Sequence, residues 1–488
     1  MSDARLPVAV IGAGPVGLAA AARLLAHGEE PIVFEQGGSV GAAILTWGHV
    51  RLFSPWRYVV DEAAAELLAA SGWVSPGPEA FPTGRELVEQ YLAPLAGLPA
   101  LRDRIRLGVR VESVTRDGFD KMKTDGRSDA PFLISAGMAD GRSETWLVRA
   151  VIDASGTAST PNPLGASGRS VPGEQAHAGR IAYGVPDILG IERDRYAGRR
   201  VLVLGNGHSA FNALLDLGRL ADDVPGMSIV WAVRRPAQRL AGLFGGGAGD
   251  QLSERGALGL RVREMVDRGQ LELVSGFRAR RVNDGPDGIR VVGDDTVLPP
   301  VDQVIVATGF RPDLSLLAEL RIALDPIVES PVALAPLLDP NLHSCGTVPP
   351  HGAEELRHPE ADVYVVGMKS YGRAPTFLML TGYEQVRSVA AAIAGDWAAA
   401  RDVRLVLPET GVCSSSLFDA PAASCCGATV DEVAAATGTA SCCAPTVTPL
   451  VPATGAAASC CTPAAPRVIQ LGTVRRASRT SEGRSAPH

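Results

Sequence analysis

The chain has 488 residues, of which 46% are hydrophobic and 20% are charged. This length suits about two to four domains, and the hydrophobic content is enough for sizeable cores. Lysines and arginines number 46 against 53 aspartates and glutamates, for a formal net charge of −7. This net negative charge argues against a protein that coats nucleic acid, since binding to phosphates needs a positively charged surface. The sequence has no uninterrupted run of about 18 apolar residues, so we expect no membrane-spanning helix and a cytoplasmic protein.

The amino-acid composition of the chain changes near residue 400. Up to that point, apolar strand-like runs alternate with Ala/Leu-rich helical runs, which is typical of an α/β fold. The remaining segment, 401–488, becomes rich in Ala, Pro, Thr, Ser and Gly and has few aromatic residues. Such a composition buries little apolar surface and predicts a largely disordered tail.

A glycine-rich turn opens the chain. The strand-like run 6–11 leads into Gly12-Ala-Gly-Pro-Val-Gly17 and a helical run, and a second strand then ends in Glu35. In a dinucleotide-binding unit, Gly12 permits a tight turn, Gly14 lets a pyrophosphate approach the backbone, and Gly17 allows helix and strand to pack closely. The helix N-terminus suits the phosphates, and the Glu35 carboxylate suits ribose hydroxyls.

A second unit of this kind lies inside the chain. A strand-like run ends at Gly205, and Gly205-Asn-Gly207-His-Ser-Ala210 opens another helical run, with Ala210 in place of the third glycine. The next strand ends in Arg234-Arg235, where a guanidinium would suit the 2′-phosphate of NADP. One acidic and one basic strand end therefore predict two different nucleotides, FAD at the first loop and NADPH at the second.

The order of these motifs resembles that of two-dinucleotide-binding-domain flavoproteins, in particular flavin-containing monooxygenases. Besides the two loops, the resemblance rests on the strand end Ala307-Thr-Gly309 and on a late strand ending at Gly367, although Met368 stands where that superfamily commonly has Asp. It implies two Rossmann-like domains, with the NADPH domain at 171–299 inserted between two parts of the FAD domain, 1–170 and 300–400. It also implies that Gly309 and Gly367 belong to the cofactor-binding residues.

The electron acceptor is predicted from the cysteines. A disulfide-reductase branch would need a CxxC or CxxxxC pair near the flavin, and the only cysteine before residue 400 is Cys345. With no dithiol to receive the hydride, molecular oxygen is the favoured acceptor. The resemblance then implies oxidation of a soft nucleophile by a C4a-peroxyflavin.

The tail contains three copies of the sequence Ala-Ser-Cys-Cys, spaced 17 and 18 residues apart. Adjacent cysteines are too close for an ordinary disulfide, so in a reducing cell both thiols tend to stay free. Paired thiolates are soft donors suited to As(III), Sb(III), Hg(II) or Cu(I). The predicted metal or metalloid ligands are Cys425, Cys426, Cys442, Cys443, Cys460 and Cys461.

Body and tail together look similar to flavin monooxygenases associated with bacterial arsenic resistance. The stretches 369–377 and 381–387 also look like that group. The resemblance implies NADPH-driven oxidation of a trivalent arsenical or antimonial to a pentavalent form, with the tail capturing the metalloid.

The segment after the first unit supplies the predicted catalytic residues. His49 and Arg51 can hydrogen-bond a reacting group or the flavin edge, and Trp56 can line the pocket. The alternative is that Trp47, Phe53 and Trp56 are plain core and that His49 is a polar residue with ordinary hydrogen bonds. Two other functions also stay open: a flavin-dependent reductase that passes electrons to metal on the tail thiols, and a metalloid-sequestering protein with a non-catalytic flavoprotein body.

Overall fold

A computed structural model of the chain describes residues 5–244, 253–342, 348–374 and 377–405. The chain divides into two compact units, Met1–Ala422 and Ala423–His488, and all the described residues belong to the first. The three tail cysteine pairs and Cys345 lie outside the described residues. Within the described residues, no helix is long and apolar enough to cross a membrane.

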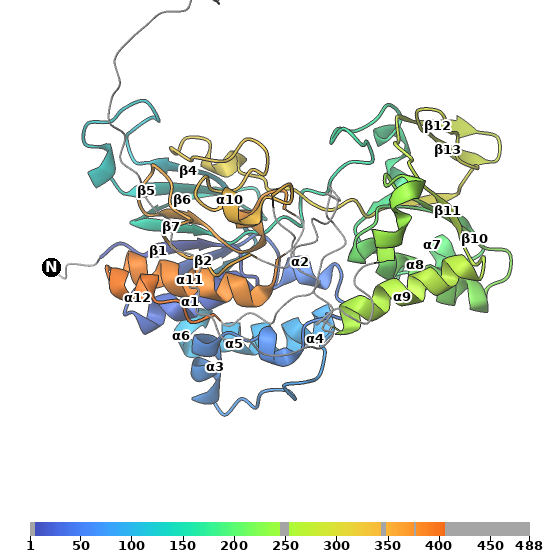
Figure 1. Cartoon of the computed structure of the whole chain (residues 1–488). Helices are drawn as coiled ribbons and strands as arrows, with labels where there is room; N and C mark the ends of the chain where they lie inside the picture. The colour runs from blue at the N-terminus through green and yellow to red at the C-terminus, as the bar shows by residue number, and fades with distance from the viewer. Residues whose placement is uncertain (1–4, 245–252, 343–347, 375–376, 406–488) are drawn as a thin grey trace, which may run out of the picture. The chain divides into compact units, whose positions relative to one another are not determined.

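Two five-stranded parallel sheets organise the described chain (Figure 1). The first has the strand order β15-β7-β1-β2-β3 and the second β11-β10-β9-β14-β8. Every strand of the second sheet falls between β7 and β15 in the sequence, so the chain leaves the first sheet and later returns to it. The α/β prediction with parallel sheets is therefore confirmed. The strands of the first sheet are β1 (Val8–Ile11), β2 (Pro31–Glu35), β3 (Ile105–Leu107), β7 (Ala150–Asp153) and β15 (Val363–Val365), and those of the second are β8 (Ile181–Tyr183), β9 (Arg200–Leu204), β10 (Ser228–Ala232), β11 (Glu272–Val274) and β14 (Gln303–Val306).

The strand β14 lies beyond the predicted end of the inserted domain at 299. It pairs in parallel with β8 and with β9, so it completes the second sheet. The sequence run at 303–306 reads as a buried strand in either sheet, because both sheets are covered on two faces.

The first sheet is covered by helices on one face and by a small sheet on the other. Alternate residues of β1 separate the two sides: Val8 and Val10 pack with α1 (Pro15–Ala26) and α11 (Met379–Ile393), while Ala9 and Ile11 face the antiparallel strands β4–β6. This alternation follows from the period of two along a strand. The other elements on these two faces are β4 (Val109–Arg116), β5 (Phe132–Met138), β6 (Ser143–Val148), α2 (Ala42–Leu45), α3 (Glu62–Ala69), α4 (Gly84–Leu87), α5 (Ala93–Gly97), α6 (Pro99–Arg102), α10 (Ala335–Leu338) and α12 (Trp397–Arg401).

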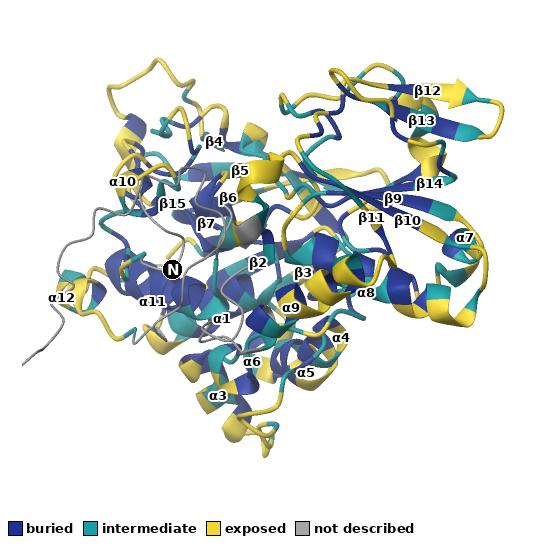
Figure 2. Ribbon diagram, turned by 45° about the vertical axis from the view of Figure 1, so that its right-hand side comes forward, coloured by how far each residue is buried: buried dark blue, intermediate teal, exposed yellow. Residues whose placement is uncertain are grey.

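The second sheet repeats this arrangement. Val201 and Val203 of β9 pack against α8 (His208–Asp223) and α9 (Ser253–Asp267), whereas Leu202 and Leu204 face the hairpin β12–β13. Figure 2 shows the central strands of both sheets buried and the outer side of α9 exposed. The remaining elements here are β12 (Arg281–Gly285), β13 (Gly288–Val292) and α7 (Arg193–Tyr196).

The helix α11 begins at Met379. The preceding residue, Leu378, has an extended backbone and caps the helix.

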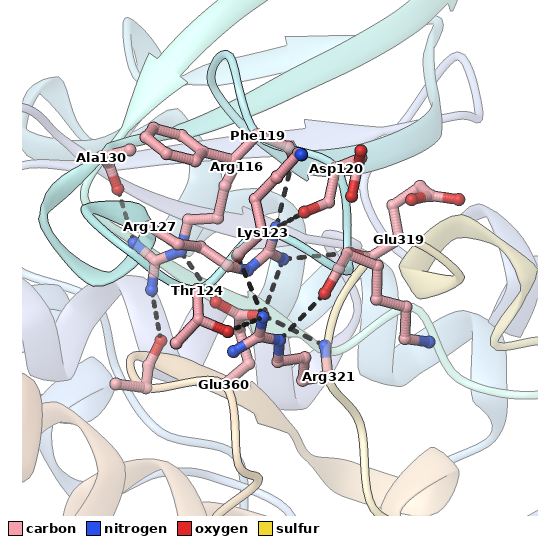
Figure 3. Close-up of polar contacts among 12 residues, drawn as sticks. Arg116, Phe119, Asp120, Lys123, Thr124, Arg127, Ala130, Glu319, Arg321 and Glu360 are labelled. Carbon is pink, nitrogen blue, oxygen red and sulfur yellow. Dashed lines mark hydrogen bonds and ion pairs between the residues drawn. The ribbon is translucent and has the colours of Figure 1, made fainter.

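The part of the molecule built around the first sheet is here named the first half, and the part built around the second sheet the second half. In the first half, a buried ionic cluster connects segments that are distant in sequence (Figure 3). Glu360 accepts a hydrogen bond from Arg116 Nε at 2.9 Å and another from Arg127 Nη2 at 2.8 Å, and all three side chains are at most 4% exposed. Arg127 also donates to the carbonyls of Asp120 and Glu319. The cluster thus fixes the loop between β4 and β5 against the segment that leads into β15.

Candidate active site

The first glycine loop is built by close backbone approach. Gly12 has φ +100°, and a Cβ there would lie 2.8 Å from the Ala154 carbonyl oxygen, at the end of the neighbouring strand β7. A Cβ at Gly17 would lie 1.9 Å from the Gly12 carbonyl oxygen. At Gly14, by contrast, a Cβ would meet nothing within 4 Å. The loop is therefore closed from behind and open at Gly14, beside the N-terminus of α1, which leaves room for a pyrophosphate.

The carboxylate of Glu35 is part of this loop. Its Oε2 accepts a hydrogen bond from Ala13 N at 2.8 Å, and its Oε1 accepts one from Gly37 N at 2.8 Å. Glu35 is 8% exposed. Each oxygen keeps a second lone pair, so the same carboxylate that shapes the loop can still accept a ribose hydroxyl.

The second loop has the same frame. Gly205 has φ +129°, and a Cβ there would lie 2.1 Å from the Ala307 carbonyl oxygen, at the end of β14. Gly207 caps α8 and, like Gly14, has open space around its Cα. Ala210 is buried in the first turn of α8. This cradle also fits a pyrophosphate at a helix N-terminus.

Two arginines follow the end of β10, the strand beside the second glycine loop. Arg234 is exposed and donates from Nη1 to the Ala166 carbonyl at 3.4 Å. Arg235 is partly buried and donates from Nη1 to the Arg239 carbonyl at 3.3 Å. Both side chains follow the strand next to the loop, which is where a 2′-phosphate would reach them.

The two later glycines occupy different places. Gly367 lies against the first loop, since a Cβ there would meet the Val16 side chain at 3.4 Å, and its N–H donates to Gln385 Oε1 at 2.7 Å. Gly309 lies where the chain segments between the two halves meet, and its carbonyl accepts from Asn162 N at 2.9 Å. Gly367 therefore lies at the first glycine loop, whereas Gly309 lies where the two segments that connect the sheets meet.

A buried lysine, Lys369, lies near the first loop and was not among the residues predicted from the sequence. Lys369 Nζ donates to Asp153 Oδ2 at 2.7 Å and to Ser155 Oγ at 2.9 Å, and the lysine and aspartate side chains are at most 1% exposed. Asp153 and Ser155 flank Ala154, whose carbonyl crowds Gly12. The ion pair therefore holds the strand end that closes the loop from behind. Only the apolar surroundings of Lys369 in the sequence could have hinted at its burial.

A cavity of about 270 Å³ lies between the segment 49–53 and one face each of α8 and α9. His49 and Arg51, two of the three predicted catalytic residues, line it. Nε2 of His49 is enclosed and has no hydrogen-bond partner among the described residues. The cavity lining also contains Val50, Leu52, Phe53, Thr83, Asn212, Leu215, Asp216, Arg219, Glu254, Leu258 and Arg261.

Trp56, the third predicted catalytic residue, does not line this cavity. It is 4% exposed and packs in the core formed with α1 and α11. Its backbone N–H donates to the Ala80 carbonyl at 2.9 Å. The alternative reading of this tryptophan as core agrees with its position.

The second wall of the cavity was missed in the sequence. Asn212, Leu215, Asp216 and Arg219 recur at helical spacing on one face of α8, but an aspartate in an Ala/Leu-rich helix reads equally well as a solvated residue. Burial raises the pKa of the Asp216 carboxyl, while the charges of Arg219 and His49 act in the opposite direction. Among the described residues, no group of three or more His, Cys, Asp or Glu side chains has the arrangement of a metal site.

A family model described as pyridine nucleotide-disulphide oxidoreductase matches residues 6–329. Over 215 residues the chain is 28% identical to indole-3-pyruvate monooxygenase YUCCA1 of Oryza sativa subsp. japonica, covering 43% of this chain and 44% of the relative. Over 225 residues it is 27% identical to flavin-containing monooxygenase 3 of Homo sapiens, covering 44% and 39%. The aligned parts therefore span less than half the length of these curated relatives.

Solved structures share the fold. Bacillithiol disulfide reductase Bdr (YpdA) from Bacillus cereus matches with a TM-score of 0.58 and 20% identity, over 80% of this chain and 99% of that chain. The FAD-bound cadaverine monooxygenase DfoA from Erwinia amylovora matches with a TM-score of 0.57 and 14% identity, over 84% and 98%. At these identities the likeness establishes the fold alone, which serves reductases and monooxygenases alike.

Proposed function

The chain belongs to the pyridine nucleotide-disulphide oxidoreductase family, and from this premise we propose that it is an NADPH- and FAD-dependent monooxygenase of a small molecule. FAD and NADPH are the cofactors of its homologues. The observation that carries the proposal is the pair of open glycine loops. The strand that follows the first loop ends in Glu35, and the strand that follows the second loop leads into Arg234-Arg235. Bound FAD would supply the redox chemistry that connects NADPH with oxygen.

The chain's own groups bind and orient these cofactors. In this proposal the α1 N-terminus and Gly14 receive the FAD pyrophosphate, while Glu35 accepts a ribose hydroxyl without releasing the two N–H groups it already holds. Gly207 and the α8 N-terminus receive the NADPH pyrophosphate, and Arg234 and Arg235 bind its 2′-phosphate.

Oxygen rather than a disulfide is the proposed acceptor. The only cysteine before residue 400 is Cys345, so the part of the chain that carries both loops contains no dithiol pair. Both curated relatives described above are named monooxygenases. These two facts favour the monooxygenase over the reductase that shares its fold.

Full-length protein reconstituted with FAD tests the proposal. It should turn yellow, oxidise NADPH faster than NADH, and consume oxygen, and a product formed under ¹⁸O₂ should carry one labelled atom. Glu35→Arg should lose FAD, because it removes both loop hydrogen bonds and the ribose acceptor. A protein that takes up no FAD, or that oxidises NADPH only when a disulfide is added, would refute the assignment.

We further propose trivalent arsenicals or antimonials as substrates. The support is the three vicinal cysteine pairs, whose thiolates suit As(III), together with the resemblance of the sequence to arsenic-resistance monooxygenases. The tail would capture the metalloid while the flavoprotein body oxidises it. Oxygen-dependent formation of arsenate from arsenite is the expected result, and its absence with a fully reconstituted enzyme would remove this substrate class.

The same tail leaves a second candidate, a flavin-dependent metal reductase that uses the tail thiols. Ending the chain after Leu407 separates the two. Monooxygenase turnover should survive the truncation at high substrate concentration, since both loops and the cavity are intact. Reductase turnover should vanish, because its acceptor site is gone.

A further inference from the structure

The cavity beside His49 carries charge of both signs in an unequal arrangement. Three arginines line it, Arg51, Arg219 and Arg261, against the two carboxylates of Asp216 and Glu254. Arg219 Nη1 forms an ion pair with Asp216 Oδ1 at 3.3 Å, so these two charges largely cancel. Two guanidiniums therefore remain against one carboxylate.

The remaining guanidiniums have donors to spare. Within the described residues Arg261 is exposed and forms no hydrogen bond or ion pair. Arg51 is exposed and uses Nη1 to donate to the Phe81 carbonyl, which leaves the rest of its five donors available. A guanidinium fork is matched in shape to a carboxylate, which it can hold through two parallel hydrogen bonds.

The cavity lining also has an apolar part. Leu215 of α8 and Leu258 of α9 face the cavity together with Leu52 and Phe53. The volume of about 270 Å³ is slightly below the usual range for small-molecule sites, about 300–1,000 Å³, so the ligand must be small. An apolar wall with a few convergent charged groups is the usual composition of such a site.

From this geometry we propose that the cavity binds a small organic carboxylate, with the carboxylate held by Arg261 and Arg51 and the hydrocarbon part against Leu215, Leu258 and Phe53. The ligand is a compact aromatic or aliphatic acid. Its binding does not require the oxidation proposed above, so either proposal can fail without the other.

The carboxylate of Asp216 does not make this a site for amines. It is already engaged by Arg219 in the ion pair at 3.3 Å. An ammonium ion in the cavity would instead meet Arg51 and Arg261 with no carboxylate except Glu254 to balance them. Like-charge contact would therefore disfavour it.

The cavity is separate from the two nucleotide loops and lies beside the second one. Its α8 residues begin at Asn212, more than a turn beyond the cap at Gly207. Phe53 lines the cavity, and its ring centroid is 5.3 Å from that of His208, the first residue of α8. A ligand here would therefore leave Gly207 open to a nucleotide.

Isothermal titration of FAD-loaded full-length protein with benzoate tests the proposal, with benzylamine as the charge-reversed ligand of the same size. We expect one benzoate per chain, weaker binding at higher salt because the arginines are exposed, and no comparable binding of benzylamine. Arg261→Gln should weaken benzoate binding about tenfold or more, the effect of one charge-assisted contact.

Arg268→Gln is the matched control, since Arg268 lies just past the end of α9, is exposed, and pairs with Glu264 outside the cavity. It should leave benzoate affinity unchanged. Leu258→Gln tests the apolar wall and should also weaken binding, with the thermal midpoint of each variant reporting whether it folds. Equal binding of benzylamine, absence of benzoate binding, or an Arg261→Gln protein indistinguishable from Arg268→Gln would overturn the proposal.

Discussion

The two glycine loops share one frame and differ in how tightly it closes. In each, the first glycine is crowded by the carbonyl that ends a neighbouring strand, Ala154 for Gly12 and Ala307 for Gly205. At the third position of the following helix, however, the first loop has Gly17, where a Cβ would overlap a carbonyl, and the second has Ala210. At this third position the first turn is therefore the tighter one, although at the first glycine the second loop is more crowded, with 2.1 Å against 2.8 Å between the Cβ position and the carbonyl oxygen. Shared backbone geometry is the reason we propose a pyrophosphate site in both loops, while local packing decides which side chains each loop tolerates.

The ends of the second strands separate the two regions further. Glu35 is bound into its own loop by two backbone N–H groups, whereas Arg234 is exposed and touches the chain weakly. The acid therefore shapes its own loop, and in the proposed function it also binds a ribose hydroxyl. The arginine has little structural work, so its contribution is expected to be to nucleotide choice.

Charge burial follows the same division. The first half contains the buried cluster Arg116–Glu360–Arg127 and the buried pair Lys369–Asp153. In the second half the corresponding pairs, such as Arg200–Asp302, are partly exposed. Breaking an ion pair should therefore cost much more in the first half than in the second.

Exchanging the third-position residues should have the largest effect. Gly17→Ala places a Cβ 1.9 Å from the Gly12 carbonyl oxygen, so the turn must open. We expect a loss of more than about 4–5 kcal/mol in the free energy of unfolding, measured by urea denaturation. The mirror change, Ala210→Gly, should cost only about 1 kcal/mol, the difference in helix propensity. Similar losses for the two variants would show that the turns are equally tight.

Removing the charge of Glu360 should have the next largest effect. Glu360→Gln leaves Arg116 and Arg127 buried without a counter-charge, which typically costs about 3–5 kcal/mol. The loss should be seen in the urea midpoint. Glu360→Asp, which keeps the charge but shortens the reach, should retain more stability than the glutamine variant. If glutamine is tolerated as well as aspartate, the cluster acts through shape and not through charge.

The same group predicts how acid acts on the first half. Burial alone would raise the pKa of Glu360, but hydrogen bonds from Arg127, Arg116 and the Arg321 N–H outweigh it and lower the pKa below its ordinary value of 4.5. A lowered pKa means that the stabilisation is complete above about pH 4.5 and is lost as the pH falls through the folded-state pKa. The acid slope of unfolding free energy should be shallower in Glu360→Gln than in the wild type.

Sequence reasoning recovered what depends on local pattern. Both loops, their strands and the helices after them follow from glycine spacing and hydrophobic runs within about 30 residues. Contacts across long separations were missed: Arg116 meets Glu360, 244 residues away, and His49 shares a cavity with Asp216. A single sequence holds no signal that pairs such residues, because each alone reads as a surface charge.

The role of Arg234 and Arg235, after the end of β10, is tested by comparing the affinities for NADPH and NADH. Arg234→Ala combined with Arg235→Ala should weaken NADPH binding about ten- to hundredfold by removing charge-assisted contacts to the 2′-phosphate. NADH binding should be unchanged, and the unfolding free energy should stay within about 0.5 kcal/mol for these substitutions outside the core. Fluorescence titration with both nucleotides gives the comparison. Equal weakening for NADPH and NADH would mean that these arginines bind the common part of the nucleotide or shape the loop.

The smallest effect is expected at the partly exposed pair of the second half. Asp302 accepts from Arg200 N at 2.8 Å and from Nη2 at 2.8 Å, and its hydrogen bonds to Arg200 lower its pKa. Asp302→Asn keeps an oxygen for the backbone N–H and loses only a screened charge, so we expect a cost of about 1 kcal/mol or less. That cost should shrink further in 1 M salt, where the Debye length is about 3 Å. A loss as large as that of Glu360→Gln, insensitive to salt, would show that the second half relies on its ion pairs as much as the first, and the contrast between buried and exposed charge would no longer distinguish the two.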